Sequence, residues 1–297
     1  MTWISMLRVL NHHLAAKLVV IAIALFLLPG CVNRMFYHPN RIEYRTAEQM
    51  PGPTRDVCFT SADGTPLHGW FVASPVSNAL GTVVHFHGNA QNLTAHSGFV
   101  DWLPAEGFHL FLFDYRGYGR SAGRPSRRGL VEDGIAALQE VRRQPEVDTN
   151  RIVIIGQSLG GTVALAAVGV QPDLRPQAMI IDSTFYSYRR IVRDKIALIP
   201  LLSWFRWPLS HALIGDRYSP ADFIADLSPT PVLFLHGTAD FVIPHHHSEW
   251  LYERAGEPKE LIIIQGGEHC SGMVQQRAEI APRIRDFMIE ALNREMP

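Results

Sequence analysis

Ten residues near the middle of the chain, Ile152-Val-Ile-Ile-Gly-Gln-Ser-Leu-Gly-Gly161, join an apolar run to a helix-like segment. The run 152–155 has no polar face, which is typical of a strand buried on both sides in a parallel sheet. The serine that follows has a glycine two positions before it and another two positions after it. Such spacing indicates a sharp strand-to-helix turn, because larger side chains would collide across the bend. We therefore predict that Ser158 presents its hydroxyl at a helix N-terminus, whose partial positive charge favours a developing anion.

Apolar runs of the same kind recur on both sides of this turn. They are 82–86, 110–113, 178–181, 232–235 and 261–264, and helical stretches lie between them near 92–106, 129–144, 159–170, 246–255 and 275–293. Two earlier strands, 55–61 and 66–74, flank the hairpin signal Asp63-Gly64. This order predicts one α/β domain over residues 55–297, with a mostly parallel sheet of about eight strands flanked by helices. An irregular insertion over about 183–229 is longer than the usual connections, and we interpret it as a short cap.

The composition is that of a globular chain. Its 297 residues are 47% hydrophobic and 19% charged, which is too apolar for a disordered chain. With 27 basic and 28 acidic residues, the formal charge of −1 gives no sign of a nucleic-acid partner. Three cysteines are too few for a disulfide scaffold.

The first thirty residues have the pattern of an export signal. Arg8 and Lys17 are their only charges, and the uncharged run 18–28 follows. Its eleven apolar residues fall short of the roughly 20 that a membrane-spanning helix needs, although an uncleaved N-terminal anchor remains an alternative. The run ends at Leu28-Pro-Gly-Cys31, which resembles the lipobox of bacterial lipoproteins.

This resemblance implies a lipoprotein signal peptide over residues 1–30 and an N-terminal tether over 31–54. Acyl chains such as palmitate on Cys31 would then hold the protein at a membrane surface without a spanning helix. The expected location is the bacterial cell envelope, facing the periplasm or the exterior.

Two further strand ends carry side chains that can activate a serine. Asp240 follows the run 232–235, and His269 follows the run 261–264. A serine hydroxyl is a poor nucleophile until a base takes its proton, and a neutral histidine needs a carboxylate to fix its tautomer. Because ligands bind at the carboxyl ends of the strands in open α/β sheets, we predict that Ser158, His269 and Asp240 meet as nucleophile, base and acid. Asp182, at the end of the run 178–181, is the alternative acid.

The order of nucleophile, acid and base resembles that of the α/β-hydrolase superfamily, and the match extends from about residue 56 to residue 292. Within it, His85-Phe-His-Gly-Asn-Ala-Gln-Asn92 resembles the HGNAGN-type membrane-associated serine hydrolases with a small cap, with Gln91 in place of the second glycine. The resemblance implies that the backbone amides of Asn89 and Leu159 form the oxyanion hole. It also includes Asp114-Tyr-Arg-Gly-Tyr-Gly-Arg-Ser121, which we interpret as structural support beneath the site.

Other reactive side chains stay outside this assignment. Three consecutive histidines, His245 to His247, would point in different directions at a helix start, so we expect no metal site there. Cys270 adjoins His269 but has no base of its own, and whether it pairs with Cys58 is open. No motif indicates a cofactor.

These residues predict a serine hydrolase that cleaves carboxylic ester or thioester bonds through an acyl-enzyme intermediate. Its expected partners are a small-molecule acyl substrate and, through lipidated Cys31, a membrane surface. A peptidase or amidase of the same fold and a catalytically silent envelope interaction module are the alternatives. The cap contains the apolar stretch 196–208, which we expect to cover either the edge of the sheet or an acyl pocket above Ser158.

Overall fold

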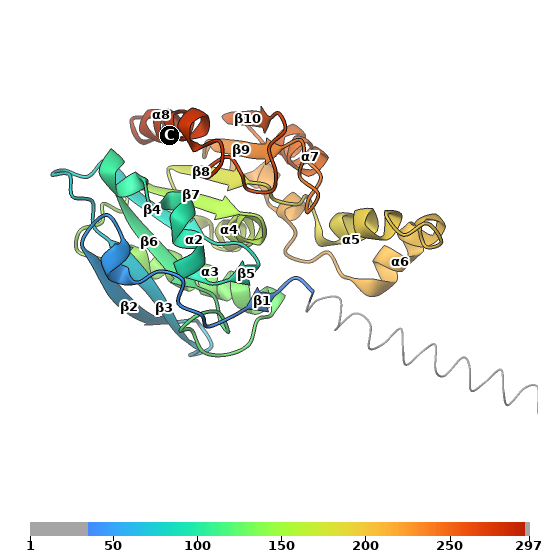
Figure 1. The fold of residues 1–297 in the computed structure, drawn as a ribbon, viewed down its shortest axis with the longest axis horizontal. Coiled ribbons are helices and arrows are strands. Elements are labelled where there is room, and N and C mark those ends of the chain that lie inside the picture. Colours follow the sequence, from blue (N-terminus) through green and yellow to red (C-terminus); the bar gives the residue numbers. More distant parts are fainter. Residues whose placement is uncertain (1–34, 295–297) are drawn as a thin grey trace, which may run out of the picture.

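The computed structural model describes residues 35–294 of the chain (Figure 1). The predicted signal peptide and the Cys31 lipidation site lie outside these residues. Within them, no helix combines the length and the apolar character needed to cross a membrane.

Eight strands form one sheet in the order β10-β9-β8-β7-β4-β6-β3-β2. Antiparallel pairing is confined to β2 with β3 and β3 with β6, and the other neighbours are parallel. The α/β-hydrolase fold predicted from the sequence is thereby confirmed. The strands are β2 (Thr54–Thr60), β3 (Pro66–Val72), β4 (Gly81–Phe86), β6 (Phe108–Asp114), β7 (Ile152–Gln157), β8 (Ala178–Asp182), β9 (Val232–Gly237) and β10 (Lys259–Ile264).

Helices cover both faces of this sheet (Figure 1). Alternate residues of each central strand enter opposite cores: Ile154 of β7 belongs to one, and its neighbours Val153 and Ile155 belong to the other. Burial on both faces explains why the central strands read as unbroken apolar runs. The first core is closed by α3 (Arg127–Val141), α4 (Leu159–Val170) and α7 (His246–Arg254), and the second by α2 (Leu93–Val100) and α8 (Arg277–Leu292).

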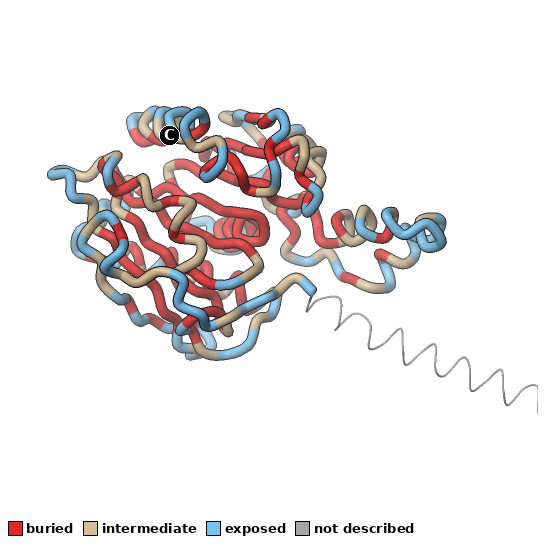
Figure 2. The backbone as a smooth tube through the Cα atoms, viewed as in Figure 1, coloured by how far each residue is buried: buried red, intermediate tan, exposed pale blue. Residues whose placement is uncertain are grey.

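The insertion after β8 is more regular than the sequence indicated. It contains two helices, α5 (Tyr188–Ala197) and α6 (Arg206–Leu213), which pack against each other as a hairpin. Ser187 begins α5 by accepting a hydrogen bond from the Arg190 amide. The hairpin projects from the body of the molecule (Figure 1), and its tip is largely exposed (Figure 2).

The apolar stretch 196–208 does not cover the edge of the sheet. Trp204 is 88% exposed and Leu201 is 86% exposed. Our expectation that this stretch covers the sheet edge or a pocket was therefore wrong for Leu201 and Trp204, whereas Ile196 and Ile199 line a cavity together with Ser158. The reason is geometric, because the tip extends beyond the body and finds no surface of the described chain to cover.

The segment predicted as a tether is packed on the body from Phe36 onward. The Phe36 ring lies 5.8 Å from that of Phe185 and 5.1 Å from that of Tyr188. The next residues form β1 (His38–Pro39), which pairs in parallel with β5 (Ala90–Gln91). This short two-stranded ladder joins the beginning of the described chain to the loop that carries Asn89.

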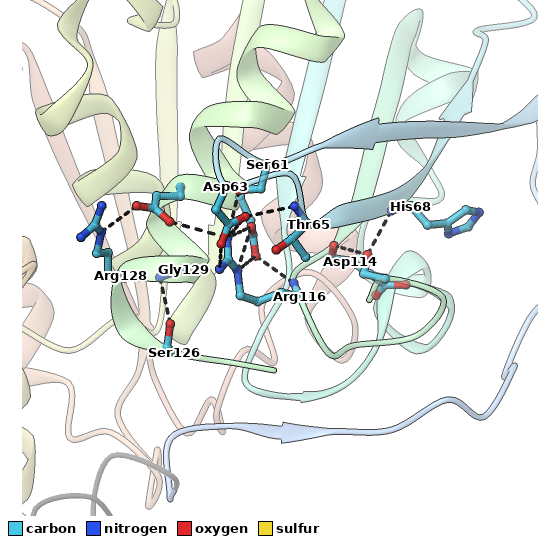
Figure 3. Close-up of polar contacts among 12 residues, drawn as sticks. Ser61, Asp63, Thr65, His68, Asp114, Arg116, Ser126, Arg128 and Gly129 are labelled. Atoms are coloured by element: carbon cyan, nitrogen blue, oxygen red, sulfur yellow. Dashed lines mark hydrogen bonds and ion pairs between the residues drawn. The ribbon is translucent and has the colours of Figure 1, made fainter. Parts of the chain in front are cut away.

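The loop after β6 carries Arg116, which forms ion pairs with two other parts of the chain (Figure 3). Arg116 donates to the buried carboxylate of Asp133 from Nε and Nη2, with a shortest distance of 2.8 Å, and to Asp63 from Nη1 at 2.7 Å. Asp63 belongs to the turn between β2 and β3. The ion pairs therefore join the first hairpin to α3 beneath the sheet, consistent with the supporting role expected for residues 114–121.

We predict that Arg116→Ala lowers the free energy of unfolding by about 3–5 kcal/mol, because it leaves the buried Asp133 carboxylate without its cation. Arg128→Ala is the matched control, since Arg128 pairs with Glu132 on the surface of α3, the helix that carries Asp133. This control should lower the free energy of unfolding by no more than about 0.5 kcal/mol. Denaturant unfolding measures both, and equal small losses would contradict the supporting role of Arg116.

Candidate active site

Ser158 stands at the bend between β7 and α4 in a conformation that non-glycine residues seldom adopt, with φ 52° and ψ −117°. The flanking glycines explain how the bend fits. A Cβ atom at Gly160 would lie 2.0 Å from the carbonyl oxygen of Phe86, and one at Gly156 would lie 2.6 Å from Cα of Gly161. The structure therefore supplies the steric reason for the spacing seen in the sequence.

Residues after β8 hold this bend and reach the loop that carries His269. The Ser158 amide donates to the Asp182 carbonyl at 2.8 Å, and the Thr184 hydroxyl donates to the Ser158 carbonyl at 2.9 Å. Ser183, between them, accepts a hydrogen bond on Oγ from the Cys270 amide at 3.1 Å. A single segment thus contacts both the turn of the predicted nucleophile and the neighbour of the predicted base.

The predicted acid and base are in direct contact. His269 Nδ1 donates to Asp240 Oδ2 at 2.7 Å, and the amides of Val242 and Ile243 donate to Asp240 Oδ1 at 2.8 Å each. Burial alone would raise the pKa of Asp240, but the hydrogen bonds from His236, His269 and the backbone outweigh it and hold that pKa well below its usual range. The carboxylate therefore stays ionised and fixes the proton of His269 on Nδ1.

His236 is a member of this arrangement that the sequence reasoning missed. Its Nε2 lies 3.1 Å from Asp240 Oδ2 and 2.8 Å from the Ile243 carbonyl, which can only accept, so Nε2 carries the proton. Its Nδ1 accepts from the Ser248 hydroxyl at 2.7 Å. The available signal was its place at the end of a buried strand, four residues before Asp240.

The amides of Asn89 and Leu159 are free to bind an anion. Neither donates to another group within residues 35–294. Two hydrogen bonds hold the Asn89 loop in place. The Asn89 carbonyl accepts them from the His38 amide at 2.8 Å and from the Tyr118 hydroxyl at 2.9 Å. The Leu159 amide is the first of α4, where helix geometry leaves it unpaired.

Ser158, Asn89 and Leu159 line one cavity of about 440 Å³. Its other walls are almost entirely apolar, and Lys195 is the one charged lining residue among those the structure describes. The walls come from the first described residues, from the turn after Asp240 and from the α5–α6 hairpin. They include Met35, Phe36, Phe185, Ile191, Val192, Ile196, Ile199, Leu213, Val242 and Ile243.

Comparison with known proteins shows the family to which the chain belongs. The family described as serine aminopeptidase, S33, matches residues 77–226. The uncharacterized protein YfhR of Escherichia coli strain K12 is 40% identical over 280 residues, covering 93% of this chain and 94% of that protein. The chain belongs to this family of α/β hydrolases.

A more distant relative and a solved structure are also similar to this chain. The alpha/beta hydrolase domain-containing protein WAV2 of Arabidopsis thaliana is 33% identical over 67% of this chain and 66% of its own length. An esterase of Pyrococcus furiosus superposes with a TM-score of 0.69 at 19% identity, covering 86% of this chain and 98% of that one. At that identity the esterase shows only that the fold is shared.

Two of the three consecutive histidines converge on one carboxylate, which the sequence analysis did not expect. His246 Nε2 and His247 Nε2 lie 3.1 and 3.0 Å from Asp194 Oδ2, and their rings stack at 5.0 Å. The three ligand-type atoms lie within 4.8 Å of one another. However, His247 Nδ1 accepts from the Tyr186 amide, so Nε2 carries the proton and acts as a donor rather than a metal ligand. These contacts attach α5 of the hairpin to α7.

The two cysteines of the described chain are free thiols. Cys58 is exposed on β2, and Cys270 is buried beside His269. Burial raises the pKa of Cys270 well above its usual value, so its sulfur remains a thiol rather than a thiolate.

Asp182, the alternative acid, lies in a different environment from Asp240. It accepts on Oδ1 from the Ser183 hydroxyl at 2.9 Å, whereas its buried Oδ2 has no hydrogen-bond partner within the described part of the chain. Burial raises the pKa of Asp182 to about 6. The structure thus pairs His269 with Asp240 and leaves Asp182 as a poorly solvated carboxyl group.

We predict that Asp182→Asn removes a pH-dependent loss of stability. A carboxyl group whose pKa is raised on folding destabilises the fold once pH rises above its unfolded value, and the effect levels off above the folded value. Between about pH 4.5 and about pH 7.5, the wild type should therefore lose about 2 kcal/mol relative to the variant. Denaturant unfolding of both proteins at the two pH values measures this difference, and a constant difference would show that Asp182 is ionised in the fold throughout.

Proposed function

We propose that the protein is a serine hydrolase that cleaves carboxylic ester or thioester bonds through an acyl-enzyme intermediate. Ser158 is the nucleophile, His269 the base and Asp240 the acid in this proposal. The observation that carries it is the apolar cavity, because Ser158 lines the same space as Asn89 and Leu159, the two residues whose backbone amides are free. An acyl chain can occupy such a cavity with its carbonyl carbon next to Ser158.

The proposed reaction begins with transfer of the Ser158 proton to His269 Nε2. The hydroxyl oxygen attacks the substrate carbonyl carbon, and the amides of Asn89 and Leu159 stabilise the oxyanion by hydrogen bonding. Asp240 stabilises the imidazolium through the bond to Nδ1, and the imidazolium then gives its proton to the departing alkoxide or thiolate. Water, activated by the same histidine, hydrolyses the acyl-enzyme and restores Ser158.

The family's description makes an aminopeptidase the second candidate. An aminopeptidase must hold the ammonium group of a peptide N-terminus, which requires a carboxylate or equivalent acceptor near the nucleophile. No aspartate or glutamate is among the cavity-lining residues of the described chain, and Lys195 would repel an ammonium group. These walls favour a neutral acyl chain over a peptide terminus.

We further propose that the enzyme is a lipoprotein of the bacterial envelope and belongs to the small-cap subgroup that its HGNAGN-like motif resembles. The basis is the sequence alone: the basic start, the apolar run 18–28 and Cys31 directly after Gly30. The mass of the mature N-terminal peptide tests this proposal, because acylation of Cys31 adds the mass of its acyl chains.

For the catalytic set, we predict that a fluorophosphonate probe modifies the wild type at Ser158 and leaves Ser158→Ala unmodified. Ser158→Ala and His269→Ala should each lower ester turnover by several orders of magnitude, and the double variant should lose little more. Asp240→Asn should lower ester turnover on the order of 10⁴-fold, because His269 then adopts the wrong tautomer.

Asp182→Asn is the matched control for the acid, being the same substitution at the neighbouring buried carboxyl group. It should keep ester turnover close to that of the wild type. The reverse ranking of the two variants would make Asp182 the acid, and an unmodified wild type would favour a silent module.

For the substrate, we predict that kcat/KM on p-nitrophenyl esters rises with acyl length by up to roughly fourfold per methylene and falls once the cavity is full. Val192→Phe should shift the optimum to shorter chains, because the added ring occupies part of the cavity. Leu201→Phe, a change outside the cavity, should leave the profile unaltered. A flat profile in all three proteins would contradict acyl binding in this cavity, and faster cleavage of aminoacyl amides would favour the aminopeptidase.

A further inference from the structure

The tip of the α5–α6 hairpin exposes a concentration of large apolar side chains. We define the tip as Leu198, Leu201, Leu202, Trp204, Phe205 and Trp207, which are between 41% and 88% exposed. None of the six lines the cavity. The patch lies at the far end of the projecting hairpin (Figures 1 and 2). Large exposed apolar side chains concentrated in one short segment typically mark a surface that contacts a partner.

The charge of the hairpin identifies the chemistry of that partner. Residues 187–213 contain five basic side chains and a single acidic one, whereas the whole chain has a formal charge of −1. One of these basic side chains lies directly against the apolar tip, because the Arg193 guanidinium stacks 3.4 Å from the centre of the Trp207 ring. Tryptophan beside arginine and lysine is the combination that membrane interfaces favour, and anionic lipid headgroups attract the positive charge.

The beginning of the described chain lies at the base of the same hairpin. Met35 lines the cavity together with Ile196 and Ile199, and Phe36 contacts the ring of Tyr188 at the start of α5. Cys31 precedes Met35 by four residues, which span at most about 14 Å even when fully extended. A lipid attached at Cys31 would therefore hold the hairpin near the bilayer.

We propose that the hairpin tip docks on the surface of an anionic lipid bilayer, with Trp204 and its apolar neighbours in the headgroup region. Ile199 is 48% exposed and Met35 is 69% exposed, so the cavity reaches the surface beside the docked tip. Acyl chains then enter the cavity from the lipid phase. This consequence rests on the proposed function, whereas docking itself does not.

Tryptophan quenching by brominated lipid tests the docking. The full chain is reconstituted in vesicles of three parts phosphatidylcholine to one part phosphatidylglycerol, with and without bromine on the acyl chains. The fluorescence that Trp204→Phe removes is the contribution of Trp204. We expect that contribution to be at least roughly twofold weaker in brominated vesicles, and the quenching to decrease in vesicles of phosphatidylcholine alone.

Trp102→Phe is the matched control, because Trp102 lies outside the hairpin and donates to the Phe99 carbonyl of its own turn. Its contribution should be the same in both kinds of vesicle. Equal Trp204 fluorescence in brominated and plain vesicles would overturn the proposal. Shielding of Trp204 from aqueous iodide without vesicles, increasing with protein concentration, would also overturn it and show that a second copy covers the tip.

Hydrolysis of p-nitrophenyl butyrate in the same samples separates this proposal from the proposed function. Quenching of Trp204 with no hydrolysis would support docking and contradict the esterase. Hydrolysis with no quenching would support the esterase and contradict docking.

Discussion

The strained backbone conformation of Ser158, with its positive φ, is the constraint on which the site depends. A residue with a side chain adopts it at a cost of order 1–3 kcal/mol, so the surrounding structure must hold it there. Three features do so: the Asp182 carbonyl, the Thr184 hydroxyl and the close contact of Gly160 with the Phe86 carbonyl. The same close contact brings α4 against the end of β4, which carries the Asn89 loop. The bend that carries Ser158 thus also brings Asn89 and Leu159, the residues with free backbone amides, to the same cavity.

Asp182 and Asp240 show how environment separates two buried carboxyl groups on neighbouring strands. Asp240 accepts from two backbone amides and His269 and also contacts His236, and these interactions hold its pKa below the usual range. Asp182 accepts one side-chain hydrogen bond, and burial raises its pKa to about 6. Both groups are largely ionised at neutral pH, but only Asp240 is hydrogen-bonded to His269, and a carboxylate stabilises an imidazolium through that bond. The contact with His269, more than position along the chain, therefore distinguishes the two groups.

Periodicity and turn chemistry were enough to predict the sheet. All eight strands were expected within a few residues of their observed bounds, because burial on both faces leaves an unbroken apolar run. The contact between His269 and Asp240 was also predictable, since both follow buried strands of a parallel sheet. The roles of His236 and of Asp194 with His246 and His247 were not, because they depend on side chains that meet only after packing. The hairpin helices were also missed, although α5 has an amphipathic pattern in which Tyr188, Ile191 and Ile196 are buried among charged residues. Both helices are short, and the apolar residues 198–205 between them carry no helical period.

The α5–α6 hairpin both lines the cavity and exposes large apolar side chains at its tip. Ile191 and Ile196 of α5 are buried and line the cavity, whereas the tip beyond them is exposed. The element is attached at its base by the contacts of Asp194 with His246 and His247 and by Phe36 against Tyr188. At the tip, in contrast, Leu201 and Trp204 are 86% and 88% exposed. A hairpin fixed at the base and free at the tip can keep the cavity walls in place while the tip contacts a surface outside the protein. The exposed tryptophans are then explained without assigning them to the core, and the cavity walls remain independent of the contact.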